Sequence, residues 1–166
     1  RSSDLMSNRF GESGAIDESV PDASFYSNFC KLHMHGDIGW HGKRYLDVKK
    51  LFRGSKLFDC GGVQCLVPNY NDDLLINIAH IIFEELHVNL GELFHIKHLL
   101  ANCDEVEILR CAEAYGWGGS CYRYLNFLKS QISRLESASS NSFASEFPLQ
   151  IPLTMVVKAF VEKRIF

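Results

Sequence analysis

The residues with the clearest chemical potential lie in the stretch "FCKLHMHGDIGWHGKRYLD", residues 29 to 47. Lys31, His33 and His35 alternate with apolar residues, so a strand would present all three on one face, with Asp37 extending the row. Two imidazoles two residues apart could bind one metal ion, and a lysine with two histidines could bind an anion. The same pattern also fits the solvated face of an edge strand.

Two Glu-x-x-His patterns, Glu84 to His87 and Glu92 to His95, have the spacing used by di-iron bundles. Such a site needs the two copies on separate facing helices. Only four residues separate His87 from Glu92, so we do not expect a shared metal site. Partial burial with a hydrogen bond is the simpler prediction for His95 and for His98.

Sequence motifs of nucleophilic and phosphate-binding enzymes are absent from the chain. There is no Gly-x-Ser-x-Gly elbow, and "GWGGSC" at 116 to 121 is not preceded by the strand that such a turn requires. Neither Gly-x-x-x-x-Gly-Lys nor Gly-x-Gly-x-x-Gly occurs. Residue types therefore predict a folded domain with an unusual polar strand.

The elements expected to position these residues fall into three segments. Residues 1 to 28 are polar and predict an irregular arm, and residues 29 to 70 predict a small β-containing part with one strand at 29 to 40 and a short helix ended by Gly54. Residues 71 to 166 predict a body of four or five helices, interrupted by a Ser-rich connector at 137 to 147.

Helix boundaries in this body can be predicted from capping residues. Asn71 is expected to cap the first helix, whose apolar face is broad, and Ser120 is expected to cap the fourth. The third should begin at Asp104 and end at Gly116. The apolar face of the first helix comprises Leu74, Leu75, Ile78, Ala79, Ile82, Phe83 and Leu86.

Composition limits the binding partners and the cellular location that we expect for the protein. The chain has 166 residues, a formal charge of −3 and 46% hydrophobic residues, which predicts one ordinary core and no extended nucleic-acid surface, although a local basic patch is compatible with these values. No apolar run is long enough to span a bilayer, so we expect no membrane partner and a cytoplasmic location. The six cysteines lack Cys-x-x-Cys spacing and are expected to be free, buried thiols.

The order of several segments resembles the uncharacterised nucleotidyltransferase-like proteins of the DNA polymerase β superfamily. The matching pieces are "KLHMH", "GW", "RYLD", "LVP" and "DDLLINIAHIIFEELHVNLGELFHIKHLL", over about residues 29 to 128. This resemblance implies an α+β fold that is mostly α, with a small N-terminal β portion of a nucleotidyltransferase-like fold before the helical body. Its chemistry would be Mg²⁺-dependent nucleotidyl transfer by three carboxylates.

The carboxylates that the resemblance requires are incomplete here. Asp4 matches the first carboxylate and metal ligand, but Met6 stands at the second, and a thioether does not bind Mg²⁺. Lys31 stands at the third, where two positive charges ~4 Å apart repel by about 4 kcal/mol at an effective dielectric near 20. Asp37 is a possible substitute. We therefore expect a nucleotidyltransferase-like protein that is inactive or incomplete. Nucleotide or anion binding would be retained by Lys31, His33 and His35. A Mg²⁺ cofactor is expected only if the protein is active.

A second hypothesis comes from a different functional class. The chain would be a helical protein-interaction module without catalytic activity, and its polar strand and exposed aromatic side chains would contact another protein or a second copy of itself. The sequence alone does not choose between the two hypotheses.

Overall fold

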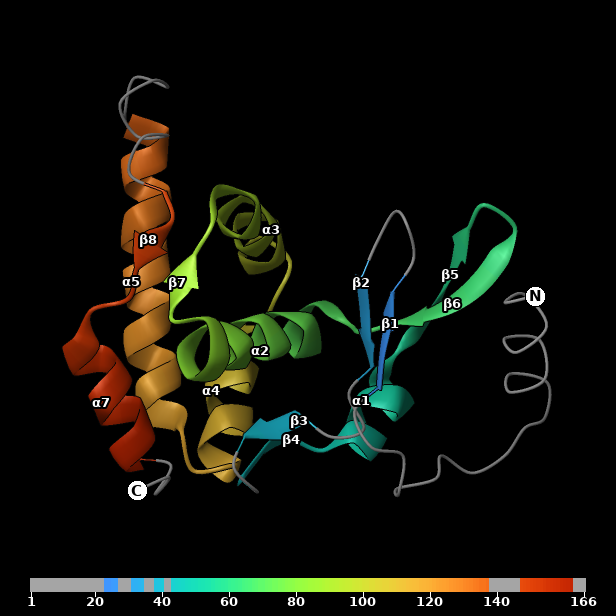
Figure 1. Cartoon of the computed structure of the whole chain (residues 1–166), viewed down its shortest axis with the longest axis horizontal. Coiled ribbons are helices and arrows are strands. Elements are labelled where there is room, and N and C mark those ends of the chain that lie inside the picture. Colours follow the sequence, from blue (N-terminus) through green and yellow to red (C-terminus); the bar gives the residue numbers. More distant parts are fainter. Residues whose placement is uncertain (1–22, 27–30, 35–37, 41–42, 138–146, 163–166) are drawn as a thin grey trace. The chain divides into compact units, whose positions relative to one another are not determined.

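The computed structural model describes residues 23–26, 31–34, 38–40, 43–137 and 147–162 (Figure 1). The chain divides into two compact units, Arg1–Gly36 and Asp37–Phe166. In the first unit, β1 (Ala23–Tyr26) pairs antiparallel with β2 (Lys31–Met34). In place of the single strand expected at 29 to 40, the described residues form two strands, β2 and β3 (Ile38–Trp40), which pair with different partners.

The second unit begins with two hairpins separated by a short helix. Strand β3 pairs with β4 (Lys43–Leu46), and Asp47 then caps α1 (Val48–Gly54) by accepting a hydrogen bond from the backbone nitrogen of Lys49 at 2.9 Å. Strands β5 (Lys56–Cys60) and β6 (Val63–Val67) follow as a hairpin. The predicted end of α1 at Gly54 is confirmed.

The described remainder of the chain is mostly helical, which confirms the predicted mostly-α, α+β class with a body of four or five helices. Helix α2 (Tyr70–His80) continues into a π-helical turn, η1 (Ile81–Glu85). After β7 (His87–Val88) come α3 (Leu90–Leu100), α4 (Glu105–Ala114) and the long α5 (Gly118–Ser137). Strand β8 (Leu149–Gln150) pairs with β7, and α7 (Leu153–Glu162) lies beside α5 (Figure 1).

Two of the predicted helix caps are wrong. Asn69 caps α2 by accepting a hydrogen bond from the backbone of Asp72 at 3.0 Å, and Asn71 instead accepts one from the backbone of Asp104 at 2.8 Å. Both asparagines are good caps, so which of them is used depends on the neighbouring start of α4. Ser120 lies in the first turn of α5, because that helix begins at Gly118.

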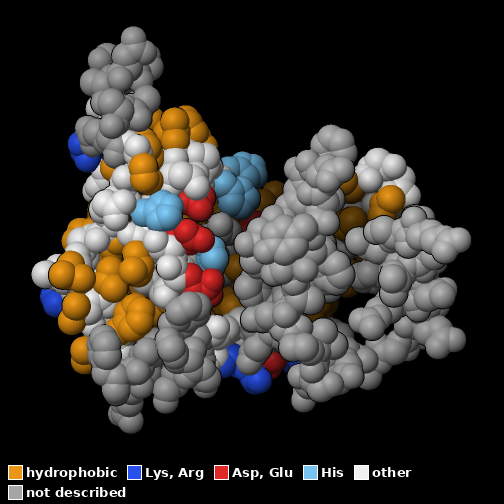
Figure 2. All heavy atoms as spheres, viewed as in Figure 1, with side chains coloured by type: hydrophobic (Ala, Val, Ile, Leu, Met, Phe, Trp, Pro, Cys, Tyr) orange, Lys and Arg blue, Asp and Glu red, His pale blue; other side chains and the backbone are white. Residues whose placement is uncertain are grey.

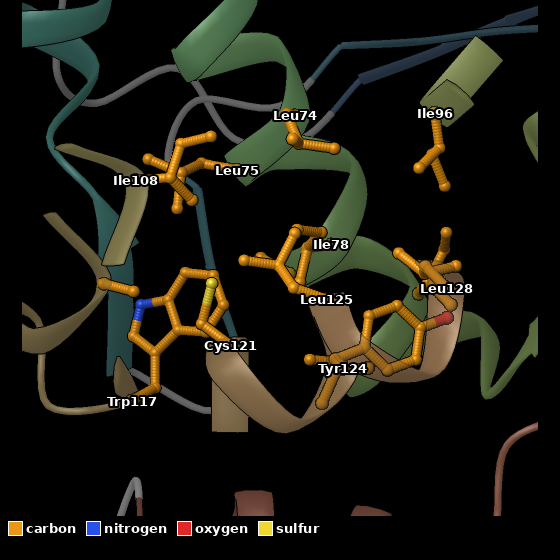
Figure 3. Packing of buried hydrophobic residues seen from close by; sticks show 14 of the residues in the cluster. Leu74, Leu75, Ile78, Ile96, Ile108, Trp117, Cys121, Tyr124, Leu125 and Leu128 are labelled. Atoms are coloured by element: carbon orange, nitrogen blue, oxygen red, sulfur yellow. The ribbon is translucent and has the colours of Figure 1, made fainter. Parts of the chain in front are cut away.

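The core is built mainly by α2, α4 and α5, with contributions from β4 and α3 (Figure 3). Ile78 and Phe83, on the predicted apolar face, are buried as expected, whereas Leu86 at its end is 38% exposed. Trp117 is completely buried and packs edge-to-face on Tyr45 and Phe83, whose rings stack 4.3 Å apart.

The end of α7 is joined to the start of α5 by a polar cluster. Glu162 accepts a hydrogen bond from the backbone of Gly119 at 2.7 Å, and its second carboxylate oxygen accepts from the Ser120 hydroxyl and, at 2.9 Å, from Arg123. A carboxylate at a helix N-terminus is favoured by the helix dipole. Ser120 therefore donates its hydroxyl hydrogen bond to Glu162 of α7 and does not cap α5.

Cysteines in the part of the chain that is described are all free thiols, as predicted, but only some are buried. Cys111 and Cys121 are buried, whereas Cys60 and Cys65 are exposed on the β5–β6 hairpin. None of the helices described is both long enough and apolar enough to cross a membrane.

Candidate functional site

The feature that departs most from an ordinary surface is the β5–β6 hairpin. Its two-residue turn, Gly61–Gly62, has φ values of +65° and +90°, which only glycine adopts readily. Asp59 stabilises the turn by accepting hydrogen bonds from the backbone of Gly62 at 2.7 Å and from the side chain of Gln64 at 3.1 Å. The hairpin is therefore well specified by local sequence.

Large apolar side chains on this hairpin are exposed to solvent. The exposed fractions are 71% for Leu57, 57% for Phe58, 63% for Val63 and 53% for Leu66. Leu57 and Leu66 are cross-strand partners on one face, and Phe58 and Val63 lie on the other, so both faces of the sheet are apolar in part. Among the described residues, β5 and β6 pair only with each other, and neither outer edge pairs with another described strand.

Positive charge is concentrated next to the hairpin. Residues 43 to 56 contain six of the chain's 17 lysines and arginines and only one acidic residue. Lys49, Lys50 and Arg53 on α1 are exposed, as is Lys56 at the start of β5. We call α1 together with β5 and β6 the α1–hairpin surface; it combines basic and apolar side chains in a chain that is acidic overall.

The base of the hairpin is tied to α2 by close contacts. The Asn69 side chain donates a hydrogen bond to the Gly54 carbonyl at 3.4 Å and to the Asp72 carboxylate at 2.6 Å. A Cβ added at Gly54 would lie 3.0 Å from the Asn69 amide nitrogen, so glycine suits this approach. Lys56 lies over the Tyr70 ring at 5.9 Å from its centroid. These contacts fix the base of the hairpin against the start of α2.

A second polar cluster lies on η1 and the adjoining residues. His80 contacts two carboxylates, Glu84 at 2.9 Å through Nδ1 and Glu85 at 3.2 Å through Nε2, and the Nε2 of His87 lies 3.8 Å from Glu85. Figure 2 shows histidine and acidic side chains gathered in this region of the molecule. Across the described ranges, no group of three or more His, Cys, Asp or Glu residues is arranged to hold a metal ion.

The two Glu-x-x-His patterns serve structural roles instead of forming one site. Glu92 completes a capping box with Asn89 at the start of α3, with hydrogen bonds of 2.8 and 2.9 Å. His95 pairs with Asp73 of α2 at 3.4 Å. The predicted partial burial of His95 and His98 is wrong, because both are exposed and the His95 side chain is 47% accessible to solvent.

Two cavities in the described part of the chain offer little room or charge for a nucleotide. One, between α1 and α4, has a volume of about 10 Å³. A groove of about 280 Å³ between α3 and α5 is wider, but the charges of its Lys97 and Lys129 are paired with Glu136 at 2.8 Å and Glu105 at 2.5 Å. Those lysines are already neutralised by carboxylates.

Most of the site residues predicted from the sequence lie outside the residues that the structure describes. Asp4, His35 and Asp37 are not among the described residues. Lys31 and His33 lie two positions apart on β2, opposite Tyr26 and Ser24 of β1. Their proposed roles in anion binding stay predictions.

The α1–hairpin surface was not predicted from the sequence, although two sequence features indicate it. The pair Gly61–Gly62 between two apolar runs is typical of a two-residue hairpin. The basic run over residues 43 to 56 is equally visible. Exposure of the apolar residues could not be predicted, because alternating apolar residues normally indicate a buried face.

Comparison of the chain with protein-family models, curated proteins and solved structures found no match.

Proposed function

We propose that this protein is an interaction module whose α1–hairpin surface binds an extended, acidic segment of a partner protein. The observation that carries the proposal is the exposure of four large apolar side chains, Leu57, Phe58, Val63 and Leu66, on a sheet of only two strands. This agrees with the second hypothesis drawn from the sequence, at a different place on the chain.

Exposed apolar groups and open strand edges both favour binding of a further strand. A two-stranded hairpin is marginally stable alone in water, and burying its apolar area would gain roughly 25 cal/mol per Å². Unpaired backbone groups along an edge strand accept an extended peptide by β-augmentation. The hairpin thus gains stability from the kind of partner proposed.

The positive charge of the α1–hairpin surface determines which kind of partner segment can bind there. Lys49, Lys50, Arg53 and Lys56 place positive charge beside the apolar hairpin. A partner strand with carboxylates next to its apolar side chains would be attracted to this surface, and a basic strand would be repelled. The expected partner is therefore an acidic and apolar segment.

The direct test uses two short labelled peptides of equal length, one alternating valine with glutamate and the other valine with lysine, measured by fluorescence anisotropy. We expect the glutamate peptide to bind and the lysine peptide not to bind. Added salt should weaken binding, because exposed charges are screened. Phe58→Ser and Arg53→Glu should each weaken it by about tenfold or more, since a few central residues carry most interface energy.

Val106→Ser provides the matched control, because Val106 is 76% exposed on α4 and lies outside the α1–hairpin surface. It should bind like the parent protein. Equal binding by Phe58→Ser and the parent would overturn the proposal. Preferential binding of a single-stranded oligonucleotide or of anionic vesicles, measured in parallel, would reject a protein segment as the occupant.

The nucleotidyltransferase-like function stays a prediction and has its own test. The protein would be titrated with ATP, GTP, CTP and UTP, with and without Mg²⁺, and followed by calorimetry. Under this hypothesis we expect metal-independent binding that Lys31→Ala abolishes, because Lys31 supplies the charge predicted to attract phosphate. Mg²⁺-dependent binding of one nucleotide would contradict the predicted loss of the carboxylate site.

A further inference from the structure

A lysine and a cysteine from distant parts of the sequence meet between α1 and α4. The Nζ of Lys50 donates a hydrogen bond to the Sγ of Cys111 at 3.3 Å, across 61 residues of chain. The same sulfur donates to the Oε1 of Glu107 at 3.3 Å. Cys111 is 7% exposed, whereas Lys50 is exposed. The amine and the thiol are therefore neighbours in a site that is largely protected from larger molecules.

The sulfur borders a small cavity that can admit a small oxidant. This cavity has a volume of about 10 Å³, and Lys50 and Cys111 both line it. A space of this size accommodates about one water-sized molecule with polar partners. Hydrogen peroxide is small and polar, so it suits the cavity better than a bulky thiol such as glutathione.

We propose that Cys111 and Lys50 form an oxidative cross-link, a sulfenamide bond between Sγ and Nζ that joins α4 covalently to α1. The oxidant is a hydroperoxide, of which hydrogen peroxide is the simplest. The inference rests on the contact between the two side chains and does not depend on the proposed binding function.

The reaction proceeds in two balanced steps. The Cys111 thiolate attacks one oxygen of hydrogen peroxide, the O–O bond breaks, and hydroxide leaves and becomes water on protonation; sulfur is oxidised to a sulfenic acid as the peroxide is reduced. The neutral Lys50 amine then attacks that sulfur, the S–O bond breaks, and the hydroxyl leaves as water with a proton from the nitrogen. Overall, one thiol, one amine and one peroxide give one sulfenamide and two waters.

The surroundings should make cross-linking faster at alkaline pH. Burial, followed by the hydrogen bond to Glu107, raises the pKa of the Cys111 thiol. The hydrogen bond to Cys111 raises the pKa of Lys50 as well. Because the reactive forms are the thiolate and the neutral amine, the yield should rise with pH. Further titratable groups around the pair are Asp47, Asp72, Glu107, Arg110 and Tyr115.

The experiment treats the whole chain with increasing hydrogen peroxide, followed by digestion and peptide mass spectrometry. We expect a linked pair of peptides containing Lys50 and Cys111, with a mass equal to their sum minus two hydrogens. Dithiothreitol should release the two peptides, since a thiol reduces the S–N bond. The linked pair should be absent from Lys50→Arg, which keeps the positive charge but lacks the amine.

Cys60 and Cys65 provide an internal reference, because both are exposed thiols in the same chain. The proposal is overturned if Cys111 stays reduced at alkaline pH, at a peroxide dose that oxidises these two thiols. It is also overturned if Cys111 is converted to sulfinic acid without a lysine link, or if Lys49 is linked as often as Lys50. Circular dichroism of Lys50→Arg checks that this variant is folded.

Discussion

Replacing Trp117 by alanine is expected to destabilise the protein by about 3–5 kcal/mol, the usual cost of removing a large aromatic side chain from a core. Trp117 is completely buried and lies against Tyr45 and Phe83. Its indole nitrogen also donates a hydrogen bond to the Tyr45 carbonyl at 3.3 Å, which joins the residue before α5 to β4 across 72 residues. Alanine would leave a cavity and a buried carbonyl without this partner.

The measurement is urea unfolding followed by far-ultraviolet circular dichroism. Since domains are typically stable by only 5–15 kcal/mol, Trp117→Ala could be largely unfolded, so Trp117→Phe is measured beside it. Phenylalanine keeps most of the packing and loses the hydrogen bond, and should cost about 1–3 kcal/mol. Val106→Ala, at a position 76% exposed, should change stability by less than about 0.5 kcal/mol. A similarly small loss for Trp117→Ala would refute its role in the core.

Raising the pH above about 9 is expected to destabilise the protein through Cys121. Burial, and to a smaller extent the charge of Glu162, raises the pKa of this thiol from 9.0 to about 12. Between these values the folded protein keeps a proton that the unfolded chain has released, so stability falls as pH rises. A difference of this size corresponds to about 4 kcal/mol, reached near pH 12.

The test compares urea midpoints of the parent and of Cys121→Ala at several alkaline pH values. Burial also raises the pKa of Tyr45 and Tyr124, so both proteins should lose stability, but the variant should lose less. Cys60→Ala is the matched control, because it removes an exposed thiol from the same chain. Parallel curves for Cys121→Ala and the parent would contradict the prediction.

Much of the helical body could be predicted because its determinants are local. The period of apolar residues predicted α2 and its buried face, including Ile78 and Phe83, and Asp104 correctly marked the start of α4. Prediction failed where two local choices were equivalent. Asn69 and Asn71 are both suitable caps, and the contact of Asn71 with the start of α4 accounts for the difference.

The candidate site was harder to predict than the fold, because its features depend on exposure and on long-range contacts. The hairpin of β5 and β6 was not predicted from the sequence, and neither was the exposure of Phe58 and Leu66. Nothing in the spacing of Lys50 and Cys111 indicated their contact, since 61 residues separate them. Which residues far apart in the sequence come into contact depends on the topology of the folded chain.

The sequence by itself determined the mostly helical class, some helix limits and the apolar faces, because periodicity, caps and glycines act over a few residues. Only the tertiary structure decided which apolar residues remain exposed and which polar groups meet. Trp117 acquires its partner Tyr45, and Ser120 its partner Glu162, only when distant segments pack together. Burial and contact are properties of the folded chain, and local pattern cannot specify them.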